Sequence, residues 1–326
     1  MLSRVADAVF WMSRYMERAE NVARFIDVNL HLALDAIDTG NAHWEPLVAI
    51  TGDNSFFRSR YGVPSRENVI KFLTLDPDYG NSIRTCLRMA RENARSVREI
   101  ISSEMWEQVN TAYLTIQEAA RTPDRIMENP HDFFTSVKKA SQLFVGITYL
   151  TMTHNEAWHF GRLGRLLERA DKTSRIVDVK YFILLRDPAD VGSTFDEVQW
   201  AALLKSASGF EMYRKRFGRI VPANVVDFLL FDRKFPRSVR YCLVKAERSL
   251  HAITGSTPGA FTNPAEQLLG RLRSDIEFGD VHEAIHSGLH DYIDRFQLRI
   301  NEVGGAIHDT FFAMHPIEHE LRVDRD

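Results

Sequence analysis

The stretch RYMERAENVARFIDV (residues 14–28) returns later in the chain as RLLERADKTSRIVDV (residues 165–179), with no gap between the two. Arg, Glu, Arg, Ala, Arg, Asp and Val agree in register, and they include a Glu-Arg pair in each copy, Glu17-Arg18 and Glu168-Arg169. Ungapped self-similarity of this kind indicates repetition of a structural unit. We therefore expect two copies of one unit within the chain.

Two further matches follow in the same order. NVIKFLTLDPDYGNSIRTCLRMA (68–90) matches NVVDFLLFDRKFPRSVRYCLVKA (224–246), and FRSRYG (57–62) matches YRKRFG (213–218). The offset between copies grows from 151 (14 to 165) to 156 (68 to 224), and a short insertion around residues 187–193 accounts for the change.

Both copies of the first stretch have the spacing of a long helix. Apolar or small residues recur at steps of three and four from Val5 to Ile37, up to a glycine cap near Thr39-Gly40, and again from Leu163 to Leu184, where Pro188 prevents continuation. No run of alternating β-branched residues indicates a strand. Further helices are expected over 82–101, 110–120, 133–151, 238–253, 263–276 and 282–312.

These patterns predict an all-α protein, a helical bundle of two repeats related by a pseudo-two-fold axis. The region between the repeats, 120–132, is short and only mildly rich in linker residues. We therefore expect one domain over 1–326, with repeat 1 at about 3–125, repeat 2 at about 154–315 and a C-terminal tail at about 316–326.

The composition excludes several classes of protein. The chain has 326 residues, of which 44% are apolar and 26% charged, with a formal net charge of −3. That charge provides no basic field for nucleic acid, and no apolar run approaches the ~20 residues of a membrane span. The charged N-terminal segment is unlike a signal peptide, so a cytoplasmic location is expected. The two cysteines, Cys86 and Cys242, are expected to be reduced core residues.

A polar cluster on each long helix is the main candidate site. On a helical wheel it lies opposite the apolar stripe. Its members could pair across the pseudo-axis, Glu17 with Arg169 and Glu168 with Arg18; they could line a cleft for an anionic or zwitterionic ligand, or for catalysis; or they could form a solvated face. The eight residues are Arg14, Glu17, Arg18 and Asn21 in the first copy and Arg165, Glu168, Arg169 and Lys172 in the second.

Two weaker patterns carry alternative chemistry. His282-Glu283-Ala284-Ile285-His286 fits the zinc-binding H-E-x-x-H pattern, with His290 one turn further on, but Leu289 and Tyr292 depart from the extended form of the motif. We predict neither a metal site there nor a cofactor. The basic pairs Arg58/Arg60 and Arg214/Arg216 precede Gly62 and Gly218 and are expected to cap helix carboxyl ends, or else to bind phosphate or carboxylate.

The stretches LSRVADAVFWMSRYMERAENVARF, LGRLLERADKTSR and FPRSVRYCLVKA together resemble the bacterial alpha-E family, an all-helical domain named for its Glu-Arg motif. The resemblance extends from Met1 to about Phe312. It implies that Glu17, Arg18, Glu168 and Arg169 are the name-giving residues. It also implies a setting beside a circularly permuted ATP-grasp protein and a transglutaminase-like peptidase, hence peptide or amide-bond synthesis or processing.

The sequence contains no P-loop, no strand-linked G-x-G-x-x-G and no G-x-S-x-G elbow. The function predicted from these observations is an accessory or binding subunit of such an ATP-grasp-linked system, with a peptide as a possible ligand held through Arg18 and Arg169. The alternatives are an enzyme of that system that uses a Glu-Arg glutamate as general base, or a zinc hydrolase built on His282 and His286.

Overall fold

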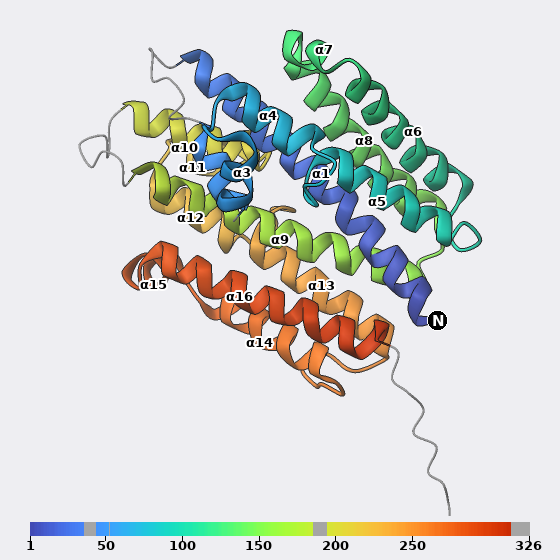
Figure 1. Ribbon diagram of the computed structural model, residues 1–326. Coiled ribbons are helices and arrows are strands. Elements are labelled where there is room, and N and C mark those ends of the chain that lie inside the picture. Colours follow the sequence, from blue (N-terminus) through green and yellow to red (C-terminus); the bar gives the residue numbers. More distant parts are fainter. Residues whose placement is uncertain (36–43, 52, 185–193, 314–326) are drawn as a thin grey trace, which may run out of the picture.

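The computed structural model describes residues 1–35, 44–51, 53–184 and 194–313. All regular structure within these ranges is helical, which confirms the all-α class (Figure 1). The two repeated stretches lie in the longest helices, α1 (Ser3–Asp35) and α9 (Glu156–Leu184). The expected helix ends near Thr39-Gly40 and Pro188, the insertion at 187–193 and the tail at 316–326 fall outside the described residues.

Helices α1 and α9 lie side by side at the centre and run in the same direction (Figure 1). Their backbones lie very close together near the start of α9. A Cβ added at Gly164 would lie 2.5 Å from the carbonyl oxygen of Phe10, and one added at Gly161 would lie 2.9 Å from Ser13 Oγ. Glycine is required at Gly164 because any side chain would displace the α1 backbone.

The other helices follow in two series. The first comprises α2 (Glu45–Thr51), α3 (Asn54–Tyr61), α4 (Arg66–Leu75), α5 (Ile83–Ser96), α6 (Ser103–Arg121), α7 (Pro123–Glu128) and α8 (Pro130–Thr151). The second comprises α10 (Thr194–Ser206), α11 (Phe210–Phe217), α12 (Pro222–Leu230), α13 (Val239–Thr254), α14 (Pro264–Phe278), α15 (Val281–His286) and α16 (Leu289–Ile307), followed by a π-helical turn, His308–Phe312.

Each central helix carries its own group of long helices. Helices α5 and α8 pack against α1, and α6 covers both of them. Helices α13 and α16 pack against α9, and α14 covers both of them. The two groups lie on opposite sides of the α1–α9 pair (Figure 1). One continuous hydrophobic core runs through all of these helices.

The matched stretches 68–90 and 224–246 form the same local structure. In each, a buried serine caps the next long helix: Ser82 accepts the N–H of Thr85, and Ser238 accepts the N–H of Tyr241. Each serine hydroxyl also donates to the backbone carbonyl of an aspartate six residues earlier, Asp76 or Asp232. These contacts fix the conformation of the segments immediately before α5 and α13, which both lie close to the central helices.

Three sequence-based helix predictions were wrong in their extent. The helix expected over 82–101 ends at Ser96. The single helix expected over 282–312 is broken into α15 and α16, because Gly288 adopts a left-handed φ of 84°. The helix expected to begin at Asn110 begins at Ser103, since Ser102 accepts the N–H of Met105 and caps an earlier start. The start of α14 at Asn263-Pro264 is confirmed.

The close helix contact gives a first test. We expect Gly164→Ala to lower the melting temperature, because the new methyl group would collide with the backbone of α1. Gly305→Ala is the matched control: this glycine is also helical, but an added Cβ meets no atom within 4 Å. The control should be neutral or stabilising by about 0.5–1 kcal/mol from helix propensity alone. Equal effects of the two substitutions, measured by thermal denaturation, would contradict the packing.

Candidate functional site

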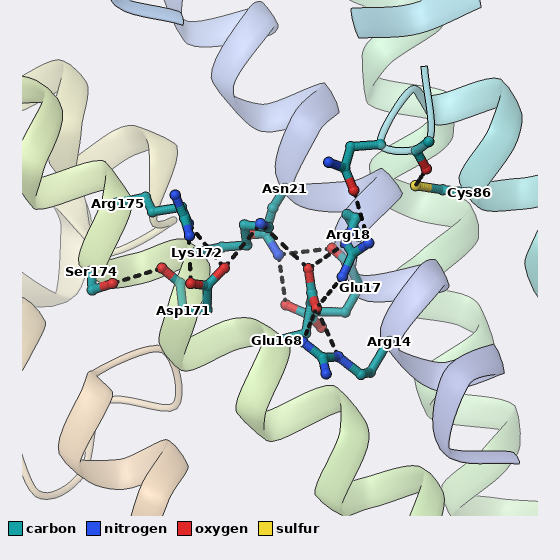
Figure 2. Close-up of polar contacts among 12 residues, drawn as sticks. Arg14, Glu17, Arg18, Asn21, Cys86, Glu168, Asp171, Lys172, Ser174 and Arg175 are labelled. Atoms are coloured by element: carbon teal, nitrogen blue, oxygen red, sulfur yellow. Dashed lines mark hydrogen bonds and ion pairs between the residues drawn. The ribbon is translucent and has the colours of Figure 1, made fainter. Parts of the chain in front are cut away.

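Glu168 of α9 is the centre of the first ion-pair cluster (Figure 2). Arg18 of α1 forms a two-pronged contact with it: Nε donates to Oε1 at 2.7 Å and Nη2 to Oε2 at 2.9 Å. Arg14 Nε donates to Oε2 at 2.9 Å, and Lys172 Nζ lies 3.5 Å from Oε1. The remaining terminal nitrogen of Arg18 donates to Oδ1 of Asn81 at 2.8 Å. Asn81 immediately precedes the capping residue Ser82.

Glu17 of α1 is the centre of the second cluster. Arg169 of α9 contacts it in the same two-pronged way, with distances of 2.9 Å to Oε1 and 2.7 Å to Oε2. Asn21 and Arg237 each donate to Oε1 at 3.1 Å. The two helices thus exchange partners reciprocally, because the glutamate of each motif binds the arginine of the other motif.

These carboxylates are removed from water, which excludes the solvated-face alternative: Glu17 and Glu168 are 1% and 0% exposed. Burial alone would raise the pKa of Glu17, but the charges of Arg169 and Arg237 outweigh it and hold that pKa well below 4.5. For Glu168 the pKa is likewise held low, since Arg18, Lys172 and Arg14 outweigh burial. Both glutamates are therefore ionised, and a carboxylate held this way is a poor general base.

A second layer of charges continues along the same helices. Glu20 accepts from Arg24 four residues later, and also from Arg237. At the matched position of α9, Asp171 accepts from Arg175, again four residues later, and from Lys172. We call the central group of polar residues the lock, and this second layer extends it. The lock comprises the eight polar residues predicted from the sequence, Arg14, Glu17, Arg18, Asn21, Arg165, Glu168, Arg169 and Lys172, together with Asn81 and Arg237.

Asn81 and Arg237 were not predicted, although the sequence contains a signal for them. In the match between 68–90 and 224–246 they occupy the same position, immediately before the capping serines. Their different chemistry concealed the match: Asn81 accepts from Arg18, whereas Arg237 brings a further cation to Glu17.

Among the described residues, Arg165 is the one member of the lock that forms no ion pair or hydrogen bond with another member, although its charge attracts Glu17. Its counterpart in α1, Arg14, donates a hydrogen bond to Glu168. The corresponding hydrogen bond to Glu17 comes from Arg237 instead of Arg165. The Nε of Arg165 is buried and has no hydrogen-bonding partner among the described residues. Burial and the nearby charge of Arg169 lower the pKa of Arg165 to about 10, and attraction to Glu17 offsets only part of that shift.

The histidine pattern does not form a three-ligand site. His282 and His286 lie exposed on the short α15, whereas His290 contacts Asp178 Oδ1 of α9 at 2.7 Å. Among the described residues, the groups with metal-like spacing are Asp27/His31/His131 and Asp178/His290/Asp294. Asp27 already binds the Lys138 ammonium and His131, so a metal ion there would have to displace a cation.

Three of the four arginines in the basic pairs bind carboxylates of this chain. Arg60 contacts Asp76 and Asp78, at 3.2 and 2.7 Å, and Arg216 contacts Asp232. The exposed Arg58 pairs with Glu45, while Arg214 lies over the ring of Phe210. The N–H groups that cap these helices come from Gly62 and Gly218, both with positive φ.

The two cysteines are buried and free, and burial raises the pKa of each thiol to about 12. They are therefore core residues without thiolate character.

With this geometry established, comparison with known proteins decides the family. A family model described as a predicted alpha-helical domain with a conserved ER motif matches residues 1–312. The chain belongs to the Alpha-E family. The reciprocal Glu17–Arg169 and Glu168–Arg18 pairs give the ER motif of this Alpha-E chain a structural context.

Curated relatives of this Alpha-E protein are uncharacterised. One from Mycobacterium bovis is 25% identical, and two from Mycobacterium tuberculosis strains are 25% and 24% identical. Each alignment covers 89% of this chain but only 36% of the relative, so the chain spans about a third of their length. No solved structure matches. Among the described helices, none is both long enough and apolar enough to cross a membrane.

We expect removal of either motif glutamate to lower the free energy of unfolding substantially. Glu168→Gln would leave Arg14 and Arg18 without their buried counter-ion, and loss of one partner of a buried pair typically costs about 3–5 kcal/mol. Glu17→Gln should behave alike. Glu45→Gln is the control, because its pair with Arg58 is exposed, and should cost about 1 kcal/mol or less. Denaturant unfolding measures all three; a Glu168→Gln variant as stable as the control would refute the structural role.

The same pairs predict a pH dependence. The pKa of Glu17 is depressed in the folded state, so its contribution is fully present above the unfolded value of about 4.5 and is lost as the pH falls below it. The stability difference between the natural protein and Glu17→Gln should therefore be largest at neutral pH and shrink between pH 4.5 and pH 3. A difference that is constant over this range, measured by denaturant unfolding, would contradict the ionised pair.

Proposed function

We propose that this Alpha-E chain is a non-catalytic accessory or binding module, in which the Glu-Arg motif holds the central helices in register. The observation that carries the proposal is the reciprocal pairing: each motif glutamate is buried and bound on both carboxylate oxygens by arginine. A general base must reach its substrate and take up a proton, whereas both glutamates are buried and their pKa values are held low by the arginines. The pairing therefore favours the structural and binding alternatives over acid-base catalysis.

The same geometry supports an origin by internal duplication. We infer two units, α1–α8 and α9–α16, related by a pseudo-two-fold axis along the α1–α9 pair. Support comes from the matched order of helices and from the equivalent partners of Glu17 and Glu168. This moves the end of the first unit from about residue 125 to the end of α8 at Thr151.

As partners we propose the proteins implied by the family resemblance, a circularly permuted ATP-grasp protein and a transglutaminase-like peptidase, in the bacterial cytoplasm. A binding module without its own reactive centre requires a partner that supplies the chemistry. The much greater length of the mycobacterial relatives is consistent with this domain acting beside other domains. The system would then make or process peptide or amide bonds.

Co-expression with the ATP-grasp protein encoded in the same genome tests this proposal. We expect the two to co-purify and to elute together in size-exclusion chromatography, with a fixed stoichiometry. An ATP-grasp protein from a biosynthetic system without an Alpha-E chain is the control and should not bind. Absence of any complex, with and without ATP and peptide, would overturn the proposed partnership.

A further inference from the structure

A cavity of about 380 Å³ lies between α1, α8 and α9, beside the lock. Its walls are mainly apolar, from Phe144, Val145 and Leu150 of α8 and Trp158 of α9. Gly146 lies on the same wall, and a Cβ added there would meet no atom within 4 Å. The volume is at the lower end of the range for small-molecule sites, which is about 300–1,000 Å³.

Two arginines of α9, Arg162 and Arg165, line one side of this cavity. Arg162 donates to Ser249 Oγ at 3.2 Å and lies 5.2 Å from the Trp158 ring centre. Neither arginine has a carboxylate within ion-pair distance among the described residues, unlike Arg14, Arg18 and Arg169. Both side chains are only partly exposed, so these cations are incompletely hydrated and a counter-ion in the cavity would be favoured.

Neighbouring charges add to this positive field. Burial lowers the pKa of Arg162, and repulsion from Arg248 of α13 lowers it further. Burial also lowers the pKa of Lys245, again with repulsion from Arg248 and Arg162. With a pKa of about 10, Arg165 still carries its charge at neutral pH. Glu17 is the nearby negative charge, and Arg169 and Arg237 already neutralise it.

We propose that this cavity binds a carboxylate attached to an apolar group, with the carboxylate at Arg165 and Arg162 and the apolar group against Phe144 and Trp158. A guanidinium presents paired donors that match the two oxygens of a carboxylate. Phosphate fits less well, because its additional oxygens would face apolar walls; Thr148, one of the few hydroxyls there, already donates to the Phe144 carbonyl. The chemistry is shared by an acylated amino acid and by a peptide with an apolar C-terminal residue.

In this proposal the site replaces Arg18 and Arg169 as the place where a ligand carboxylate is held. Each of those arginines already binds a glutamate through two nitrogens and another acceptor, Asn81 or the Pro236 carbonyl, through the third. The proposal deepens the binding role proposed above. It does not require the ATP-grasp partnership, so the two can fail separately.

Isothermal titration of the purified full chain with N-acetyl-phenylalanine, Ala-Ala-Phe, N-acetyl-phenylalaninamide and inorganic phosphate provides the test. We expect N-acetyl-phenylalanine to bind at least tenfold more tightly than its neutral amide. If Ala-Ala-Phe binds as tightly as N-acetyl-phenylalanine, the site accepts peptide C-termini. If Ala-Ala-Phe does not bind, the site is specific for acylated amino acids. Equal binding of acid and amide, binding of phosphate alone, or no binding of either carboxylate at millimolar concentration would overturn the proposal.

Variants locate the site. Arg165→Gln and Arg162→Gln should each weaken binding of N-acetyl-phenylalanine at least tenfold, and Arg165→Gln should not lower the melting temperature, because it removes an unpaired buried cation. Gly146→Leu fills the cavity without touching a charge and should also abolish binding. Arg121→Gln, in an exposed pair on α6, is the control and should bind normally. Normal binding by both Arg165→Gln and Gly146→Leu would exclude this cavity.

Discussion

The reciprocal exchange of Glu and Arg between α1 and α9 is the constraint on which the rest of this structure depends. Glu17 binds Arg169 and Glu168 binds Arg18, so sliding one helix along the other in either direction would stretch one of the two pairs. Because the pairs are buried, separation would leave charges without counter-ions in the core. The pairing therefore selects one register, and the close contact at Gly164 reinforces it.

Buried ion pairs are not an efficient source of stability, since desolvation offsets much of their attraction. Two long apolar helices would pack well in several registers, and burial of charge penalises all registers but one. The further layer formed by Glu20, Asp171 and their arginines repeats this arrangement along the axis. We infer that the lock contributes specificity of assembly, which suits a motif present in both α1 and α9. In this arrangement Arg165 has no ion-pair partner among the described residues, and its side chain lines a cavity.

Much of the fold was predictable from sequence, because helical periodicity and the internal matches are local signals. The cross-pairing of the motifs was foreseen as one alternative, but the periodic pattern could not decide between pairing, ligand binding and a solvated face. That decision depends on which helices cover α1, and α5, α8 and α9 together bury both of its faces.

Arg237 was missed because its match, Asn81, has a different side chain. The helix break at Gly288 was missed because a glycine within a periodic segment gives no local sign of its φ. The cavity beside Arg165 depends on how α1 packs against α8 and α9, which lie far from it in the sequence.

A double-mutant cycle between Arg18→Gln and Glu168→Gln tests the central claim most directly, because it isolates the interaction between two side chains from the cost of changing each one. If the two form a buried pair across α1 and α9, the double variant should be more stable than the sum of the single effects predicts, by about 2 kcal/mol or more. Additive effects in denaturant unfolding, within about 0.5 kcal/mol, would show that the residues do not interact and would contradict the lock.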